Sequence, residues 1–116
     1  MDFDVFYEYV AALPYSEATT PFGPDTLVFK VGGKVFLLAG IEEFKAFNVK
    51  CDPEYAVTLR EEYHGIIPGW HMNKKHWNTI QLGQDVTWPM MKELIKHSYD
   101  LVYQSLPKKL KNEMPL

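Results

Sequence analysis

The sequence has a single cysteine, Cys51, so no disulfide can form within the chain. Chains without disulfides are typical of reducing compartments, and we therefore expect a cytoplasmic protein. No apolar run approaches the roughly 20 residues of a membrane-spanning helix, and the first four residues lack the basic start of a signal peptide. An excess of basic residues is also missing. The 15 acidic and 12 basic side chains give a net charge of -3, which is not typical of a nucleic-acid-binding protein.

What the sequence does contain is material for one small core. The chain has 116 residues, of which 47% are apolar and 15% aromatic. This length fits one domain over residues 1–116, and this composition argues against disorder. The sequence shows no internal repeat and no low-complexity segment.

Charge is unevenly distributed along the chain. Residues 1–63 carry eleven acidic and five basic side chains, whereas residues 64–116 carry four acidic and seven basic ones. An anionic partner is therefore expected to contact the second half. Ordinary solvated faces that happen to segregate would give the same pattern, and both interpretations stay open.

Periodicity and turn residues predict the elements of the fold. Helical spacing predicts helices over residues 2–13, 52–63 and 88–106, the last two capped by Asp52 and Thr87. Runs of β-branched and aromatic residues predict strands over residues 27–31, 34–39, 45–51, 70–72 and 77–82. The Gly32-Gly33 pair predicts a tight hairpin turn between the first two strands, because glycine accepts positive φ angles.

Loops and helix ends complete this prediction. We expect residues 15–24 to form a loop, Gly65 to end the second helix in a left-handed cap, and residues 66–69 to form a bend. Pro107 ends the last helix, and the residues after it are expected to fray. The order α-βββ-α-ββ-α favours an α+β fold, with helices flanking a curved antiparallel sheet of about five strands.

Several segments together resemble a known family. They are Gly69-Trp70-His71-Met72-Asn73-Lys74-Lys75-His76-Trp77, Asp52-Pro53-Glu54, Ser98-Tyr99-Asp100-Leu101-Val102, Pro21-Phe22-Gly23, Val28-Phe29-Lys30-Val31 and Gly33-Lys34-Val35-Phe36. In these segments the chain resembles the MmcQ/YjbR family of small bacterial proteins over nearly its whole length. The resemblance implies a CyaY-like or secretion-chaperone-like fold and a "double-wing" DNA-binding role, and it implies no enzymatic activity.

The turn at residues 73–77 is the strongest candidate for DNA contact. Lys74, Lys75 and His76 could meet phosphates, while aromatic side chains stack on bases. His71, Asn73 and Trp77 complete the candidate set. The alternative is a solvated turn in which Asn73 takes a positive φ angle. Because tryptophan is mostly buried, we expect Trp70 and Trp77 to pack in the core.

Other polar residues give weaker indications of a functional site. A hairpin centred on residues 73–74 would place His71 opposite His76, where the two histidines share a metal or hydrogen-bond to each other, but no zinc motif accompanies them. Cys51 precedes a helix start and is either a nucleophile, with His64 or His71 as base, or a small core residue. The adjacent pairs Glu42-Glu43 and Glu61-Glu62 indicate surface positions.

Three functions follow, with no cofactor expected for any of them. The first is a DNA-binding module that uses the basic second half. The second is a peptide- or protein-binding adaptor that presents an apolar patch with Trp88, Met90 or Tyr103 on the last helix. An enzyme is the third, and no motif assembles its nucleophile, base and orienting group. We expect a monomer or homodimer that does not bind membranes.

Overall fold

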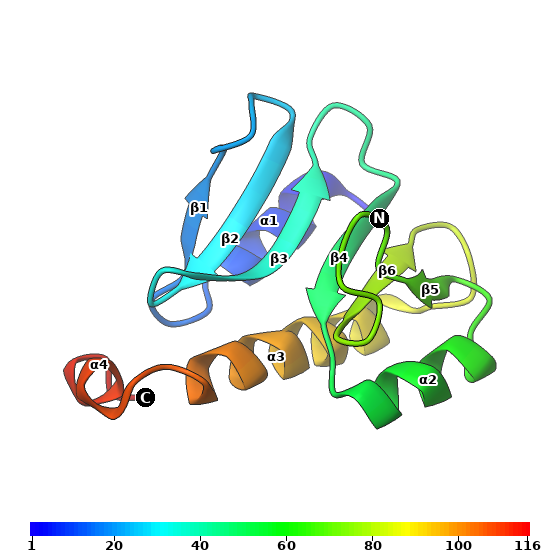
Figure 1. Ribbon diagram of the computed structural model, residues 1–116. Coiled ribbons are helices and arrows are strands. Elements are labelled where there is room, and N and C mark those ends of the chain that lie inside the picture. The colour runs from blue at the N-terminus through cyan, green and yellow to red at the C-terminus, as the bar shows by residue number, and fades with distance from the viewer.

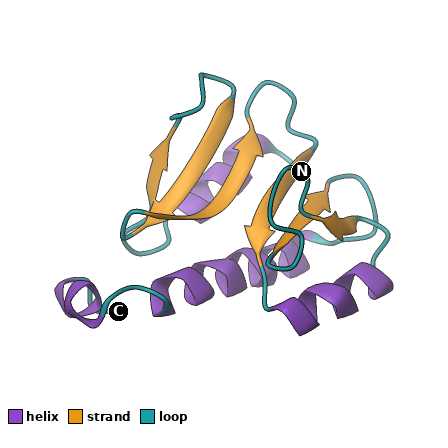
Figure 2. Ribbon diagram, in the orientation of Figure 1, coloured by secondary structure: helices purple, strands orange, loops and turns teal.

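The computed structural model describes all 116 residues as one six-stranded antiparallel sheet with four helices (Figures 1 and 2). The helices are α1 (Phe3–Ala11), α2 (Pro53–Glu62), α3 (Trp88–Gln104) and α4 (Lys108–Glu113). The strands are β1 (Glu17–Thr19), β2 (Thr26–Val31), β3 (Lys34–Gly40), β4 (Ala46–Lys50), β5 (Ile66–Pro68) and β6 (Trp77–Gln81). The expected α+β class is confirmed, with six strands where about five were predicted.

The strands follow the order β1-β2-β3-β4-β6-β5, and all neighbours are antiparallel. In Figure 1, α1 lies behind β2 and β3, and α3 runs beneath the sheet. Strand β4 shows why the helices gather on one side: its buried residues Phe47 and Val49 alternate with the half-exposed Ala46, Asn48 and Lys50. One face of the sheet therefore carries the core, and the other, which we call the open face, has no helix over it.

A β-bulge increases the apolar content of the core face. Phe29 pairs with Leu37, but its neighbour Lys30 pairs with Val35, so Phe36 is an extra residue on β3. Phe36 and Leu37 are consequently both buried. The ring of Phe36 packs edge to face on that of Tyr99 in α3, with the ring centroids 5.3 Å apart.

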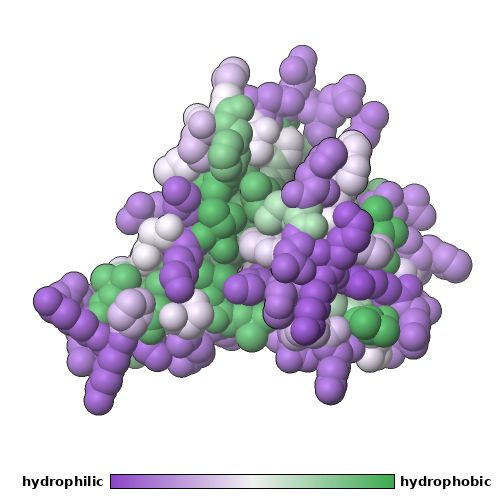
Figure 3. Space-filling model, in the orientation of Figure 1, coloured by the Kyte–Doolittle hydropathy of each residue, from purple (hydrophilic) through white to green (hydrophobic).

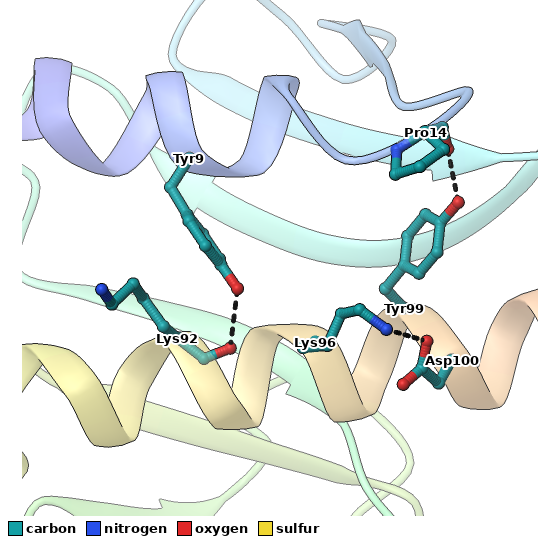
Figure 4. Close-up of polar contacts among 6 residues, drawn as sticks. All are labelled: Tyr9, Pro14, Lys92, Lys96, Tyr99 and Asp100. Carbon is teal, nitrogen blue, oxygen red and sulfur yellow. Dashed lines mark hydrogen bonds and ion pairs between the residues drawn. The ribbon is translucent and has the colours of Figure 1, made fainter. Parts of the chain in front are cut away.

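Tyrosine side chains connect α1 and its following turn to α3 (Figure 4). The Tyr9 hydroxyl donates to the carbonyl oxygen of Lys92 at 3.2 Å, and the Tyr99 hydroxyl donates to the carbonyl oxygen of Pro14. The exposed Lys96 and Asp100 form an ion pair at 2.6 Å, one turn apart on α3. The two helices on the core face are thus held to each other as well as to the sheet.

Ser98 joins α3 to the sheet at the point where the pairing of β3 with β4 ends. Its fully buried hydroxyl donates to the Phe36 carbonyl oxygen at 2.6 Å and accepts from the Lys50 amide at 2.8 Å. The pairing itself stops at Leu37 and Val49. One hydroxyl therefore satisfies two backbone groups that the separating strands leave without partners.

The predicted hairpin and helix caps are confirmed. Gly32 and Gly33 have φ angles of 57° and 82°. Asp52 accepts from the Tyr55 amide at 3.1 Å, and Thr87 accepts from the Met90 amide at 3.3 Å.

Predictions for the chain ends and for the segment around residues 65–72 were wrong in five places. The loop at 15–24 contains β1, which pairs with β2. Residues 66–68 form β5, the hairpin partner of β6, whereas residues 70–72 form no strand. The segment after Pro107 forms α4, because Leu110 packs against Gly32 of the hairpin.

Gly65 is the fifth correction, since its φ angle is not positive. A side chain is excluded there for a different reason: an added Cβ would lie 2.8 Å from the Gln84 Cβ. Asp85 accepts from the His64 and Gly65 amides at 2.8 Å, and these hydrogen bonds lower the pKa of the Asp85 carboxyl.

No helix combines the length and apolarity that crossing a bilayer requires.

We predict that Ser98→Ala lowers the free energy of unfolding by about 1–3 kcal/mol, because the Lys50 amide and the Phe36 carbonyl lose a buried partner. Chemical denaturation measures this difference. Ser105→Ala is the matched control, since the exposed Ser105 ends the same helix and its loss is expected to cost less than about 0.5 kcal/mol. Equal costs for the two variants would contradict the bridging role.

A second prediction concerns His97, which accepts from the Asp52 amide at 3.1 Å and packs edge to face on Tyr55. Burial lowers the pKa of His97 from its usual 6.5, and the nearby Asp52 and Asp100 carboxylates only partly offset this. The unfolded chain therefore binds the proton more tightly, so stability falls as pH drops below about 6.5. His97→Gln keeps an acceptor but cannot titrate. Urea midpoints between pH 7.5 and 5 should fall less in His97→Gln than in the parent protein, and parallel curves would contradict this.

Candidate functional site

A groove of about 720 Å³ lies on the open face of the sheet. Its floor is apolar at Val35, Leu38 and Ala46 and polar at Asn48 and Thr79. Leu38, Asn48 and Thr79 are cross-strand neighbours on β3, β4 and β6, so their side chains point to the same side. Figure 3 shows the apolar strip that runs down this face beside a hydrophilic loop.

Two exposed aromatic side chains line the groove, Phe22 at 72% and Trp70 at 70% exposure. Phe22 comes from the turn before β2, and Trp70 comes from residues 69–76, which we call the 69–76 loop. Trp70 stacks on His71 with ring centroids 4.7 Å apart. Large aromatic side chains left in water beside an apolar floor are typical of a binding surface.

The hydroxyl of Thr79 fixes the 69–76 loop to the sheet from the groove side. It accepts from the Trp70 amide at 3.0 Å and donates to Oδ1 of Asn48. The backbone of Trp70 is therefore two hydrogen bonds away from the Asn48 side chain. This chain of bonds sets both the position of the indole and the orientation of the amide.

Arg60 of α2 holds the same loop from the other side. Its Nε donates to Oδ1 of the buried Asn78 at 2.6 Å, and its Nη2 donates to the carbonyl oxygens of Lys74 and, at 3.3 Å, Trp77. A planar guanidinium can satisfy several acceptors at once, which a lysine ammonium on a flexible stem does less well. The loop is thus clamped between α2 and β6.

Local backbone geometry shapes the loop. Gly69 is required because an added Cβ would lie 2.7 Å from the Trp77 Cβ. His71 has a φ angle of 61°, a left-handed conformation that costs a non-glycine residue about 1–2 kcal/mol. The prediction that Asn73 takes this conformation was wrong. Asn73 instead accepts from the Lys75 amide through its side chain at 3.0 Å.

The structure places five of the six predicted site residues on the 69–76 loop and the sixth, Trp77, at the start of β6, and it divides them between the two sides of the loop. His71 lines the groove, whereas Lys75 lies near Arg60 and Glu54 on the α2 side. Lys74 and Asn73 are exposed at the turn. His76 and Trp77 are half-buried, and the His76 carbonyl accepts from the Cys51 amide at 2.7 Å.

The expectation that Trp70 packs in the core was wrong, because residues 70–72 are loop rather than strand. Phe22, Asn48 and Thr79 were not identified from the sequence as site residues. The alternation along residues 46–50 could have indicated that Asn48 faces away from the core. Nothing in the sequence places Phe22 across from Trp70, since 48 positions separate them.

The basic residues of the second half do not form one surface. Lys92 and Lys96 lie on α3, on the core side of the sheet. Three more lysines lie on α4, at the end of the molecule opposite α2 (Figure 1): Lys108, Lys109 and Lys111. Of the basic residues in the second half, only Lys74 and Lys75 lie on the 69–76 loop, and neither lines the groove, so a broad electrostatic footprint is absent.

Cys51 is a core residue. It is 3% exposed and packs among Val49, Leu59 and Leu94 with no space for a water molecule. Burial raises the pKa of its thiol to about 11, which opposes formation of the thiolate. His64 and His71 do not lie at this position; His97 lies beside Cys51 instead.

The metal and adaptor surfaces predicted from the sequence also differ from the structure. The hairpin that would set His71 opposite His76 does not form, and no three metal-ligating side chains gather anywhere. Tyr103 is buried, and Trp88 and Met90 are half-buried against the core, so they form no exposed patch. Glu42, Glu43, Glu61 and Glu62 are exposed as expected.

Comparisons with known proteins agree on one family. The YjbR family model matches residues 11–101. The uncharacterized protein YbdF of Escherichia coli O157:H7 is 39% identical over 98 residues, which cover 84% of this chain and 80% of YbdF. The uncharacterized protein YjbR of Escherichia coli strain K12 is 28% identical over 101 residues, which cover 86% of each chain.

Solved structures show the same fold. The crystal structure of Deinococcus radiodurans protein DR2400, with its DUF419 domain, has a TM-score of 0.91 and 36% identity over 98% of this chain and 88% of that one. A crystal structure from Pseudomonas syringae has a TM-score of 0.74 and 28% identity, covering 88% of this chain and 99% of that chain.

We predict that Arg60→Ala raises the rate of tryptic cleavage after Lys74 and Lys75 about ten-fold, because removal of its charged hydrogen bonds frees the loop. Mass spectrometry of timed digests measures this rate. Thr58→Ala on the same helix is the control, since its hydroxyl bonds only to its own helix at Glu54. The clamp is refuted if both variants are cleaved at the parent rate.

Proposed function

The chain belongs to the YjbR family, and on that premise we propose that it is a non-enzymatic cytoplasmic protein that binds single-stranded DNA on its open sheet face. The bases lie in the groove between Phe22 and Trp70. The phosphates pass the exposed side of the 69–76 loop.

The observation that carries this proposal is the pair of exposed aromatic side chains on one groove. Phe22 and Trp70 are each about 70% exposed, although burying either would be favourable. Stacking a base on an aromatic side chain contributes about 1–3 kcal/mol and tolerates any base. Such a surface suits the unpaired bases of a single strand.

Charge near the groove is compatible with a polyanion. The 69–76 loop carries Lys74 and Lys75 and no acidic residue. Lys45 at the rim is paired with Glu43 at 3.5 Å, but both side chains are largely exposed. Solvent screens such a pair, so Lys45 remains available to a phosphate.

Single strands fit this surface better than duplex DNA. Reading a duplex usually requires a helix or ribbon inside the major groove and many phosphate contacts. The scattered lysines of α3 and α4 supply no such array, and the basic helix α4 has only six residues. A single strand needs only stacking platforms and a few cations.

Peptide binding is the second candidate, favoured by the apolar floor at Val35, Leu38 and Ala46. The neighbouring edge strand β1 is exposed along all three of its residues. An extended peptide could place apolar side chains on this floor, or could add as a strand at the β1 edge, which contributes no residue to the groove. Peptide binding of this kind would depend little on salt, whereas DNA binding would weaken steeply.

We predict that the protein binds a fluorescein-labelled 15-nucleotide single strand, and that Trp70→Ala weakens binding about ten-fold by removing one stacking platform. Fluorescence anisotropy at 50 and 200 mM salt measures the affinity. The double variant Lys74→Ala/Lys75→Ala should reduce the salt slope by about 1.4, because each phosphate that a lysine neutralises adds roughly 0.7 to the slope on a single strand.

The matched control is Lys108→Ala/Lys109→Ala, which removes the same charge from α4 and should leave the slope almost unchanged. If both double variants change the slope equally, the lysines act only through net charge. If the parent protein binds no DNA at low salt, the DNA proposal is wrong and peptide binding becomes the leading candidate.

A further inference from the structure

Asn78 of β6 is a polar residue of the core whose side-chain amide is only half satisfied. It is 1% exposed, and its Oδ1 accepts from Nε of Arg60 at 2.6 Å. Its Nδ2 amino group has no hydrogen-bond partner. The cavity beside it is lined mostly by apolar side chains and has no space for a water molecule. Two N–H donors are therefore buried unpaired, which lowers the stability of the folded protein.

A rotated amide would not remove this loss. Nε of Arg60 can only donate, so rotation would set Nδ2 of Asn78 against another donor and leave Nε without an acceptor. The guanidinium thus fixes the orientation of the amide. An apolar side chain of similar size would fill the same position without burying an unpaired donor. Packing alone therefore does not explain an asparagine at this position.

The partner of Asn78 indicates what the asparagine does. Arg60 joins α2 to the 69–76 loop, because its Nη2 donates to the carbonyl oxygens of Lys74 and Trp77. The guanidinium is planar, so the hydrogen bond from Nε to Asn78 sets the plane in which Nη2 points. Arg60 is only half-buried. Without the acceptor on Asn78, its long side chain can turn toward solvent and release the loop.

We propose that Asn78 is a positioning residue of the groove: it orients Arg60, and through Arg60 it holds the 69–76 loop in the conformation that presents Trp70. Asn78 itself touches no ligand, since it lies on the core face of β6 beside Ile80. The core thus loses stability where the loop gains order. The consequence for DNA binding rests on the proposed function, whereas the consequence for the loop does not.

Two substitutions separate this role from ordinary packing. Asn78→Leu removes the acceptor together with the unpaired donors, so the protein should melt at or above the parent temperature while the loop loosens. Asn78→Asp keeps an acceptor for Nε and adds a charge opposite the guanidinium, but it leaves a second carboxylate oxygen against the apolar cavity. This variant should melt below the parent temperature while the loop stays in place.

Loop order is measured by tryptic cleavage after Lys74 and Lys75, well below every melting temperature, and binding by anisotropy with the 15-nucleotide single strand. We expect Asn78→Leu to be cleaved about ten-fold faster and to bind about three-fold more weakly, because the stacking platform is less ordered. Asn78→Asp should match the parent protein in cleavage rate and should bind more tightly than Asn78→Leu. In an Arg60→Ala background, Asn78→Leu should not accelerate cleavage further, because it acts through Arg60.

Cleavage of Asn78→Leu at the parent rate would overturn the positioning role. A lower melting temperature in Asn78→Leu, with faster cleavage along the whole chain, would overturn it too, because the asparagine would then contribute only to packing. Faster loop cleavage with unchanged DNA affinity would overturn the link between the loop and the groove. If the parent protein binds no DNA, the proposed function fails, and the cleavage rates alone decide whether Asn78 orients Arg60.

Discussion

Alternation along β4 and β6 turns Phe47, Val49 and Ile80 toward α1 and α3 and turns Asn48 and Thr79 the opposite way. The helices can bury only the first set, because they lie on one side of the sheet (Figure 2). The open face follows from this arrangement. Its cross-strand rows keep enough apolar surface to hold a ligand and enough polar atoms to orient one. The groove is thus a consequence of how the core forms.

The 69–76 loop converts that face into a defined site. Arg60 holds the loop on one side and Thr79 holds it on the other. These hydrogen bonds stand in for the strand pairing that the backbone of the loop lacks, and the Trp70 side chain remains exposed to solvent. The left-handed conformation of His71 is tolerated because these contacts determine the path of the chain on both sides of it. Rigid placement of an exposed aromatic ring lowers the entropy cost of stacking a partner on it.

Local signals in the sequence predicted most of the fold, because they act over a few residues: the Gly32-Gly33 turn, the Asp52 and Thr87 caps, and the spacing of α3. Long-range contacts explain the failures. The three-residue strands β1 and β5 exist only because β2 and β6 offer pairing partners, and α4 forms because Leu110 meets Gly32. Only part of the candidate site could be identified from the sequence. The lysines of the loop were identified, whereas Phe22 and Asn48 became site residues only once the chain had folded.

Because Cys51 is buried, a thiol-reactive label can be directed to one chosen position of the chain. The only thiol is enclosed by Val49, Leu59 and Leu94, and burial raises its pKa to about 11. Maleimide reagents should therefore not react with it at neutral pH. A cysteine introduced at an exposed position of the 69–76 loop would then be the single reactive group on the folded protein. A dye or spin label attached there would report the motion of the loop directly, without removal of any native residue from the core.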